Sequence, residues 1–365
     1  MRLNPQIRLS RKPADAVVGL DIEAGSVAAT EVHVNGVASV RSAAIAPLPA
    51  GTFHEGEVLD PDRLAAALKD LFSRHKLSKR VRLGVGNQRV IVRTVRLPVL
   101  EDPKEMDAAV RFQAQDQIPM PLDQAVLEHQ VVGGVPAEEG VAPQVDVLVV
   151  AARRDMVSSF LRPIRQAGLH PVGVDLSAFG MIRALASEAV VAEAGEVGER
   201  PAEAVLYCNL GDSMNLAVAR GASCLFTRVS HVGLESIAGE FGSRQGLIPE
   251  HAMQWLVHVG LQRPLAEVEG DPETVTAARQ ALEAGVTALI DELRLSLDYY
   301  GAQEAALPVG RILLCGPGSA IAGLPEQMAE RLGMQIEARH PAALANLDAI
   351  SAARLTLPFG LALER

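Results

Sequence analysis

The residues best suited to chemistry lie where apolar strands end in small-residue loops. The first such loop follows the apolar segment 17–20 and contains Asp21, Gly25 and Ser26. A carboxylate is a hard oxygen ligand for Mg²⁺, and backbone N–H groups in a glycine-containing loop can approach phosphate oxygens closely. The strand that leaves this loop turns back at an Asn-Gly pair, residues 35–36, which is typical of β-hairpins. The pattern predicts a hairpin that carries a phosphate-and-magnesium site, with Asp21 as the metal ligand.

A second loop of the same kind occurs far downstream. The strand-like segment 204–208 ends in a polar loop that contains Asn209, Gly211, Asp212 and Ser213. Another strand leaves this loop, turns at an Arg-Gly pair and returns. Because the order of strand, polar loop, strand, turn and strand repeats that of the first hairpin, the sequence predicts an internal duplication.

A third small-residue loop contains Gly316, Gly318 and Ser319 and follows the apolar strand 311–315. If the two duplicated halves pack across a cleft, their loops face each other, and the third loop lies where a base or ribose could rest. Asp175 ends a further strand, just before a helix. It either caps that helix or, as a catalytic candidate, positions a water near a terminal phosphate.

The alternative without a binding site is that Gly25, Gly211 and Gly318 serve only as turn residues. Other site signals are absent from the sequence: there is no Gly-x-x-x-x-Gly-Lys-Ser/Thr, Gly-x-Ser-x-Gly or His-Glu-x-x-His motif. His251 and His258 share a helical face but have no further ligand at metal-binding spacing, so they are interpreted as structural.

Composition limits the classes of function. The chain has 365 residues, of which 48% are hydrophobic and only 3% aromatic, so we expect two or more domains with cores of Ala, Val and Leu. A net charge of -10 argues against a nucleic-acid-binding face. The three cysteines, Cys208, Cys224 and Cys315, show no disulfide or metal spacing, which fits a reducing compartment. No apolar run reaches the roughly 20 residues needed to span a bilayer, so we expect a cytoplasmic protein without membrane insertion.

Longer stretches of the chain carry a family resemblance. They are the strand Val-Gly-Leu-Asp-Ile at 18–22, Ile-Pro-Met-Pro-Leu at 118–122, Leu-Val-Val-Ala-Ala-Arg-Arg at 148–154, Ala-Gly-Leu-His-Pro at 167–171, Leu-Phe-Thr-Arg at 225–228, Glu-Leu-Arg-Leu-Ser-Leu-Asp-Tyr-Tyr at 292–300 and Leu-Cys-Gly-Pro-Gly-Ser at 314–319. In this order and spacing they resemble the family of the type IV pilus assembly protein PilM, within the actin-like ATPase superfamily and related to the cell-division protein FtsA.

The resemblance implies an α/β fold class: a two-lobed actin-like (ribonuclease H-like duplicated) fold with a small inserted α+β module. The expected parts are a basic N-terminal tail at 1–14, lobe 1 at 15–87 with 169–200, the inserted partner-binding module at 88–168, the core of lobe 2 at 201–230 with 301–365, and a mostly helical subdomain of lobe 2 at 231–300. Within the last part of lobe 2, the segment 358–363 is expected to form a terminal helix.

The resemblance also implies a cytoplasmic scaffold of type IV pilus assembly, peripheral at the inner face of the membrane through a partner. Its implied partners are the N-terminal peptide of a PilN-like membrane protein, bound at the inserted module and its groove, and the pilus assembly motor ATPases. Self-association stays open. The implied cofactor is ATP with Mg²⁺, clamped between the first and second loops, with the third loop at the adenosine.

Three departures from the family pattern fall on this site. Glu23 stands where the family has Gly, Ala28 where it has Lys, and Asn209 where it has Asp. An extra carboxylate about 4 Å from a phosphate costs on the order of 1 kcal/mol in water and about 4 kcal/mol at a shielded site. We therefore expect a nucleotide-binding or pseudo-ATPase scaffold rather than an efficient enzyme.

Two alternatives remain. One is an active ATP-hydrolysing or phosphotransferring enzyme of the same superfamily. A sugar kinase would need an aspartate base beside a sugar pocket, and the sequence offers no convincing candidate. The other is an FtsA-like cell-division protein or a type II secretion cytoplasmic protein. FtsA-like proteins end in an amphipathic membrane helix, whereas the final segment here, 358–365, is expected to belong to the core, which favours PilM.

Overall fold

The structure is a computed structural model that describes residues 16–134, 142–193, 203–303 and 306–363. The expected basic tail at 1–14 lies outside the described residues. The segment 195–201 is acidic and contains glycine, which predicts an exposed link, and it also lies outside the described residues.

Lobe 1 is built on a five-stranded sheet with the order β10-β6-β1-β2-β3. Its strands are β1 (Val17–Ile22), β2 (Ser26–Asn35), β3 (Val37–Pro47), β6 (Arg80–Val85) and β10 (His170–Leu176). The first three form an antiparallel meander, and β6 and β10 are added in parallel. Gly36 joins β2 to β3 with a φ of 81°, a backbone conformation that favours glycine.

Lobe 2 repeats this arrangement with the order β13-β12-β11-β14-β15. Its strands are β11 (Ala204–Leu210), β12 (Met214–Arg220), β13 (Ser223–Ser230), β14 (Val309–Cys315) and β15 (Gln335–Ala338). Again a meander of three strands is extended by two parallel strands. The predicted internal duplication is therefore confirmed at the level of sheet topology.

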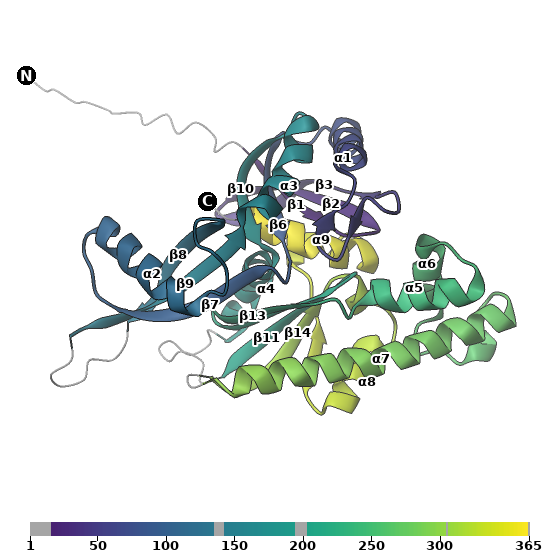
Figure 1. The fold of residues 1–365 in the computed structure, drawn as a ribbon. Coiled ribbons are helices and arrows are strands. Elements are labelled where there is room, and N and C mark those ends of the chain that lie inside the picture. Colours follow the sequence, from purple (N-terminus) through teal and green to yellow (C-terminus); the bar gives the residue numbers. More distant parts are fainter. Residues whose placement is uncertain (1–15, 135–141, 194–202, 304–305, 364–365) are drawn as a thin grey trace, which may run out of the picture.

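A separate three-stranded sheet with the order β7-β9-β8 projects from lobe 1 (Figure 1). It comprises β7 (Val90–Pro98), β8 (Ala125–Gly134) and β9 (Gln144–Arg153), with helix α2 (Pro103–Gln117) on one face. Alternation along β9 divides its side chains between two cores: Val147 and Val149 pack with α2, and Leu148 packs toward the centre of the molecule. Each face of this sheet is thereby partly buried.

Two helices cover the outer side of lobe 1. Helix α1 (Pro61–His75) begins at Asp60, whose side chain accepts the N–H groups of Asp62 and Arg63. Helix α3 (Arg154–Gln166) follows the inserted sheet, but its buried side chains Met156, Phe160 and Ile164 join the core of lobe 1. The chain therefore returns to lobe 1 with α3, before β10 begins.

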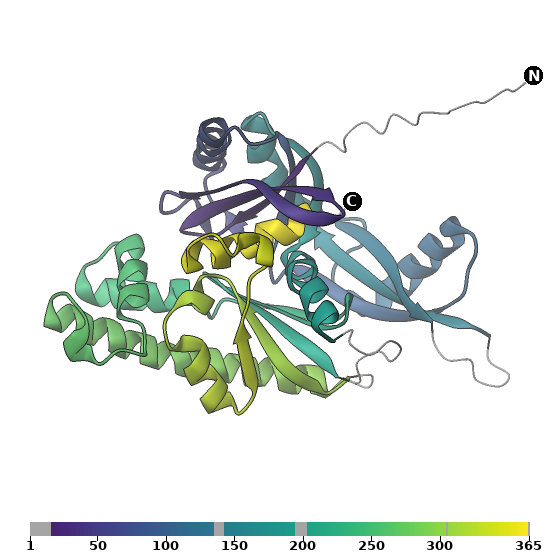
Figure 2. The ribbon, with the colours of Figure 1, turned by 180° about the vertical axis from the view of Figure 1, so that it is seen from behind.

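Two further helices lie between the two large sheets, as Figures 1 and 2 show from opposite sides. They are α4 (Ser177–Glu193) and α9 (Ala349–Ala362), and their side chains share one core with residues of both lobes. The two helices approach closely at Gly180 and Gly360, where a Cβ on Gly360 would lie 1.8 Å from the Gly180 carbonyl oxygen. Only glycine fits this crossing.

Helix α9 starts earlier than the sequence predicts. The expected start at Pro358 is wrong, because α9 begins at Ala349, with Asp348 accepting the N–H of Ser351 at 2.9 Å. Pro358 lies inside the helix and has no N–H to bond the carbonyl of Arg354. Burial of the whole second half of α9 stabilises the helix despite this lost bond.

The remaining elements flank lobe 2 and the mouth of the cleft. They are the short hairpin strands β4 (Phe53–His54) and β5 (Glu57–Val58), the helices α5 (Leu234–Gln245), α6 (Pro249–Val259), α7 (Pro272–Gly301) and α8 (Leu324–Leu332), and the 3₁₀ turns at Leu265–Glu267, Pro317–Ala320 and Ala342–Leu344. Among the helices in the described part of the chain, none combines the length and apolar character needed to cross a membrane.

Candidate functional site

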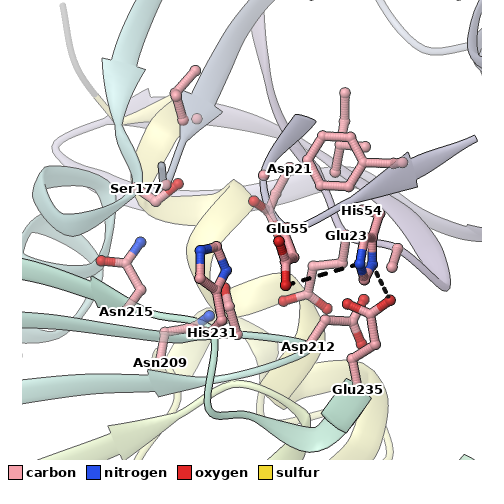
Figure 3. Close-up of a pocket in the computed structure, with 18 of the residues that line it drawn as sticks. Asp21, Glu23, His54, Glu55, Ser177, Asn209, Asp212, Asn215, His231 and Glu235 are labelled. Atoms are coloured by element: carbon pink, nitrogen blue, oxygen red, sulfur yellow. Dashed lines mark hydrogen bonds and ion pairs between the residues drawn. The ribbon is translucent and has the colours of Figure 1, made fainter. Parts of the chain in front are cut away.

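A cavity of about 360 Å³ lies between the lobes and is rich in carboxyl groups. Lobe 1 contributes Asp21 and Glu23 from the first loop, and lobe 2 contributes Asp212 from the second loop and Glu235 from α5. Figure 3 shows Glu23, Asp212 and Glu235 close together in this cavity. The sequence brings these groups together because the strands that precede both loops, β1 and β11, end at the same cleft.

Asp21 is paired with an arginine from the far end of the chain. Nη1 of Arg354 lies 2.5 Å from Asp21 Oδ2, and the two side chains are only 5% and 7% exposed. Nε of the same guanidinium donates to Ser26 Oγ at 2.9 Å, and Nη2 donates to the Ser26 carbonyl at 3.1 Å. The two polar side chains that the sequence assigns to metal and phosphate are therefore both bound by Arg354.

Glu23 occupies the space between the two loops. Its Oε2 lies 3.3 Å from Arg354 Nε, and a Cβ on Gly211 would lie only 2.0 Å from its Oε1. Burial raises the pKa of Glu23 to about 8, and the neighbouring carboxylates of Asp212 and Asp21 add to this against the opposing effect of Arg354. The Glu23 carboxyl therefore keeps its proton to a higher pH than a free glutamate does.

The two loops are also joined directly. The backbone N–H of Gly25 donates to Asp212 Oδ2 at 3.1 Å. Burial raises the pKa of Asp212, while this hydrogen bond and Arg354 act in the opposite direction. The first loop of lobe 1 thus contacts the second loop of lobe 2 directly.

A second contact between the lobes lies at the edge of the cavity, and sequence reasoning missed it. His54 Nδ1 lies 2.9 Å from Glu235 Oε1, and Glu55 lies on the other side of the ring at 3.9 Å. The hydrogen bond to Glu235 raises the pKa of His54. His54 and Glu235 are 181 positions apart, and no motif links them in the sequence.

The other predicted binding residues surround the second loop. Asn209 and Ser213 line the cavity, and Asn209 Oδ1 lies 3.6 Å from Cys315 Sγ at the end of β14. The third loop packs behind them: a Cβ on Gly316 would lie 2.6 Å from Asn209 Oδ1, and one on Gly318 would meet Leu210. Ser319 bonds within this loop, to the Gly316 carbonyl. The structure therefore brings all three predicted loops together.

Asp175, the catalytic candidate, is not among the residues that line the cavity. It forms an ion pair with Arg183 of α4 and accepts the N–H of Leu176 at 2.8 Å.

The cysteines are buried free thiols, and burial raises the pKa of each. Across the described residues, no cluster of three or more His, Cys, Asp or Glu side chains is arranged to hold a metal ion.

The residues present do not fit a bound Mg-triphosphate. Asp21 and Ser26 already bind Arg354, and Glu23 fills the space over Gly211. No lysine or arginine is among the described residues that line the cavity, whose charged groups are mainly carboxyls. Phosphate oxygens placed here would face these carboxyls with no lysine or arginine in the described lining to offset them.

The comparison with known families decides which family the chain belongs to. Residues 19–363 match the family description "Type IV pilus assembly protein PilM". The chain belongs to the PilM family. It is similar to the PilM structure solved as a "PilM-PilN type IV pilus biogenesis complex", with 26% identity, coverage of 96% of this chain and 98% of that one, and a TM-score of 0.77.

A more distant likeness concerns the fold alone. The ethanolamine utilization protein EutJ from Carboxydothermus hydrogenoformans is 12% identical, with coverage of 96% of this chain and 90% of that chain and a TM-score of 0.53. The predicted PilM family and the two-lobed actin-like fold class are thus confirmed. Arg354 was missed in the sequence, although a lone arginine in the apolar helix 349–362 is a signal for a buried partner.

Proposed function

We propose that this chain is a cytoplasmic scaffold of type IV pilus assembly that holds the N-terminal peptide of a PilN-like membrane protein. The observation that supports this most is the similarity to the PilM of a PilM–PilN complex, which extends over nearly the whole of both chains. In this role the chain is peripheral to the inner face of the membrane, and its partner supplies the attachment.

The edge strand β10 is our proposed docking position for the peptide. It ends the sheet of lobe 1, and its side chains alternate between exposed and half-buried. Val172 and Val174 are each 39% exposed and lie on the same face of the strand. An extended peptide can add to such an edge through backbone hydrogen bonds, with its side chains against the exposed valines.

The inserted module is the other part of this proposal. Its strand β8 is also an edge strand and exposes Val131, which is 49% accessible. Because α3 leads from the inserted sheet into lobe 1 and directly to β10, the module is tied to the proposed docking edge by short covalent connections. We propose that the PilN-type peptide binds at β10 and that the module limits its position.

The test is a calorimetric titration with a synthetic peptide of the N-terminal cytoplasmic segment of the PilN protein from the same genome. The double variant V172D/V174D should weaken binding by about tenfold or more, because each change removes an apolar contact worth roughly 1–2 kcal/mol. The matched control is V37D, since Val37 is 81% exposed at the β2–β3 turn, away from β10. Equal affinity of both variants, or no binding by the wild type, contradicts the proposal.

Contacts with the motor ATPases and self-association belong to the same proposal. Pull-down of the motor ATPases and a sedimentation measurement test these two points separately from the peptide. Absence of motor binding in the presence of the peptide argues against the motor contact only.

The second candidate function is an ATP-hydrolysing or phosphotransferring enzyme. The actin-like fold favours it, and the local chemistry of the cleft opposes it, because Asp21 is engaged by Arg354 and Asp175 by Arg183. A phosphate-release assay with Mg-ATP distinguishes the candidates: turnover without peptide binding favours the enzyme, and peptide binding without turnover favours the scaffold.

A further inference from the structure

We infer that Arg354 is a built-in cation that holds the first loop against the second loop, so that the two lobes are joined at Gly211 and Asp212 without Mg-ATP. This inference concerns the cleft between the lobes and does not depend on where a partner peptide binds.

The guanidinium of Arg354 binds the oxygen atoms of the first loop that an external cation would otherwise bind. Its planar fork reaches Asp21 Oδ2, Ser26 Oγ and the Ser26 carbonyl with separate nitrogens, and Nη2 is also 3.4 Å from the Asp21 carbonyl. Arginine stays charged at all relevant pH values and matches such an array of oxygens by geometry. A metal ion or phosphate at this position would have to displace a buried, fully charged side chain.

The first loop transmits this fixed position to lobe 2 through two contacts. Glu23, which also faces Arg354, lies against Gly211, where a side chain of any other residue would collide with it. Two residues further along, the Gly25 N–H binds Asp212. Because both contacts start from the loop that Arg354 holds, loss of the guanidinium loosens both at once.

Arg354 cannot swing out of the site with its helix. On lobe 1, a Cβ on Gly19 would lie 1.9 Å from the Pro358 carbonyl, so α9 presses directly on β1. Arg82 donates to the Leu361 carbonyl at 3.2 Å, and Arg183 donates to the Gly360 carbonyl at 3.1 Å. These contacts fix the C-terminal part of α9, and Asp348 caps its start.

Glu23, which departs from the family pattern, and Arg354 depend on each other. An additional carboxyl at Glu23 is tolerated because a guanidinium lies 3.3 Å away and because the carboxyl has room over a glycine. Arg354 in turn requires the oxygens of the first loop, since a buried guanidinium without hydrogen-bond partners is strongly unfavourable. Glu23 and Arg354 thus form one arrangement.

The test measures nucleotide binding and closure separately. Calorimetric titration of the full chain with Mg-ATP at millimolar concentration should give no binding. Hydrogen exchange should show a slowly exchanging Gly25 amide in the absence of nucleotide, and Mg-ATP should leave it unchanged. In R354M, which keeps an apolar stem without the charge, the exchange of segments 21–26 and 211–213 should rise by about tenfold or more.

The matched control is R279M. Arg279 is also buried and binds backbone carbonyls, but it lies on α7 within lobe 2, so its loss should leave exchange at the two loops unchanged. If R354M does not fold, R354K serves the same purpose, because lysine keeps the charge but cannot bind Asp21 and Ser26 in one plane. Binding of Mg-ATP by the wild type below millimolar concentration, or loop exchange unaffected by loss of the guanidinium, overturns the inference.

Discussion

The backbone N–H of Gly25 lies 3.1 Å from the carboxylate of Asp212, and these two residues are 187 positions apart in the chain. The contact joins the equivalent loops of the two duplicated halves. In an actin-like clamp these loops hold the phosphates of a nucleotide between them, as the family resemblance implies. Here the loops hold each other.

The first prediction concerns the glycine beneath Glu23. G211A should lower the free energy of unfolding by about 0.5–1.5 kcal/mol, because the new methyl group would push the Glu23 carboxyl, the end of a flexible side chain, out of its place over Gly211. The double variant E23A/G211A should lose much less than the single changes together, since it removes the clashing atom. Urea unfolding measures both.

The control for this prediction is G239A on α5, where a Cβ would meet nothing within 4 Å. It should be neutral or slightly stabilising, as expected for alanine in a helix. If G211A behaves like G239A, Glu23 does not lie over Gly211 in solution.

The second prediction is a loss of stability with rising pH. The pKa of Glu23 is raised from 4.5 to about 8 in the folded protein, so between these values the folded state holds a proton that the unfolded chain has released. The contribution of this proton to the free energy of unfolding is fully present near pH 4.5. It decreases as pH rises toward 8, by up to about 1.4 kcal/mol per pH unit for one proton. E23Q should flatten the curve of unfolding free energy measured from pH 5 to pH 8.

Asp155 provides the contrast for this measurement. Its pKa is lowered to about 2 by hydrogen bonds from Arg153 and the Met156 N–H, so its titration lies below the window. D155N should therefore leave the slope between pH 5 and pH 8 unchanged. A slope that persists in full in E23Q would assign the pH effect to other groups, such as Asp212 and Glu235, whose pKa values are also raised.

The third prediction concerns the contact between His54 and Glu235. Because Glu235 binds the imidazolium, the pKa of His54 is raised above 6.5, and the contact stabilises the protein below that pH and is lost as pH rises through the folded pKa. Since His54 is half exposed, the effect on stability is small, about 0.5–1 kcal/mol. NMR titration of the His54 ring should show the raised pKa, and E235Q should lower it more than E55Q does.

The fourth prediction is a gain of nucleotide binding. E23G/R354S removes the carboxyl that fills the cleft and the guanidinium that engages Asp21, so Mg-ATP should bind where the wild type shows no heat. E23G/N209D, which brings the loops nearer the family pattern but retains Arg354, should still fail to bind. Adding D21N to the binding variant should abolish its affinity. No binding by E23G/R354S means that the loops are not placed as in nucleotide-binding relatives.

The sequence was sufficient to predict most of the fold, because its signals are local. The Asn35-Gly36 turn, the cap at Asp60 and the alternation along β7 each depend on neighbouring residues. The duplication could be predicted because the hairpin pattern occurs twice. The loops at Asp21, Asp212 and Gly316 could be grouped only through this repeated topology.

The details of the site depended on contacts that the sequence does not encode locally. Arg354 lies 333 positions from Asp21, and Pro358 indicates a helix start that would leave Arg354 outside the helix. A proline inside a buried helix is tolerated only where tertiary packing offsets the lost hydrogen bond, and no local pattern reveals such packing. The same holds for His54 and Glu235, which meet only when the lobes close.

The position of α9 has a consequence for how the protein folds. This helix covers one face of the first sheet, yet in the chain it follows the whole of lobe 2. During synthesis β2 therefore emerges long before α9, and the face of β2 that carries Ala28 and Val32 stays without this helix until lobe 2 is complete. Contacts over such long sequence separations fold slowly and leave aggregation-prone intermediates. The arginine that closes the cleft is thus also among the last residues to reach its place.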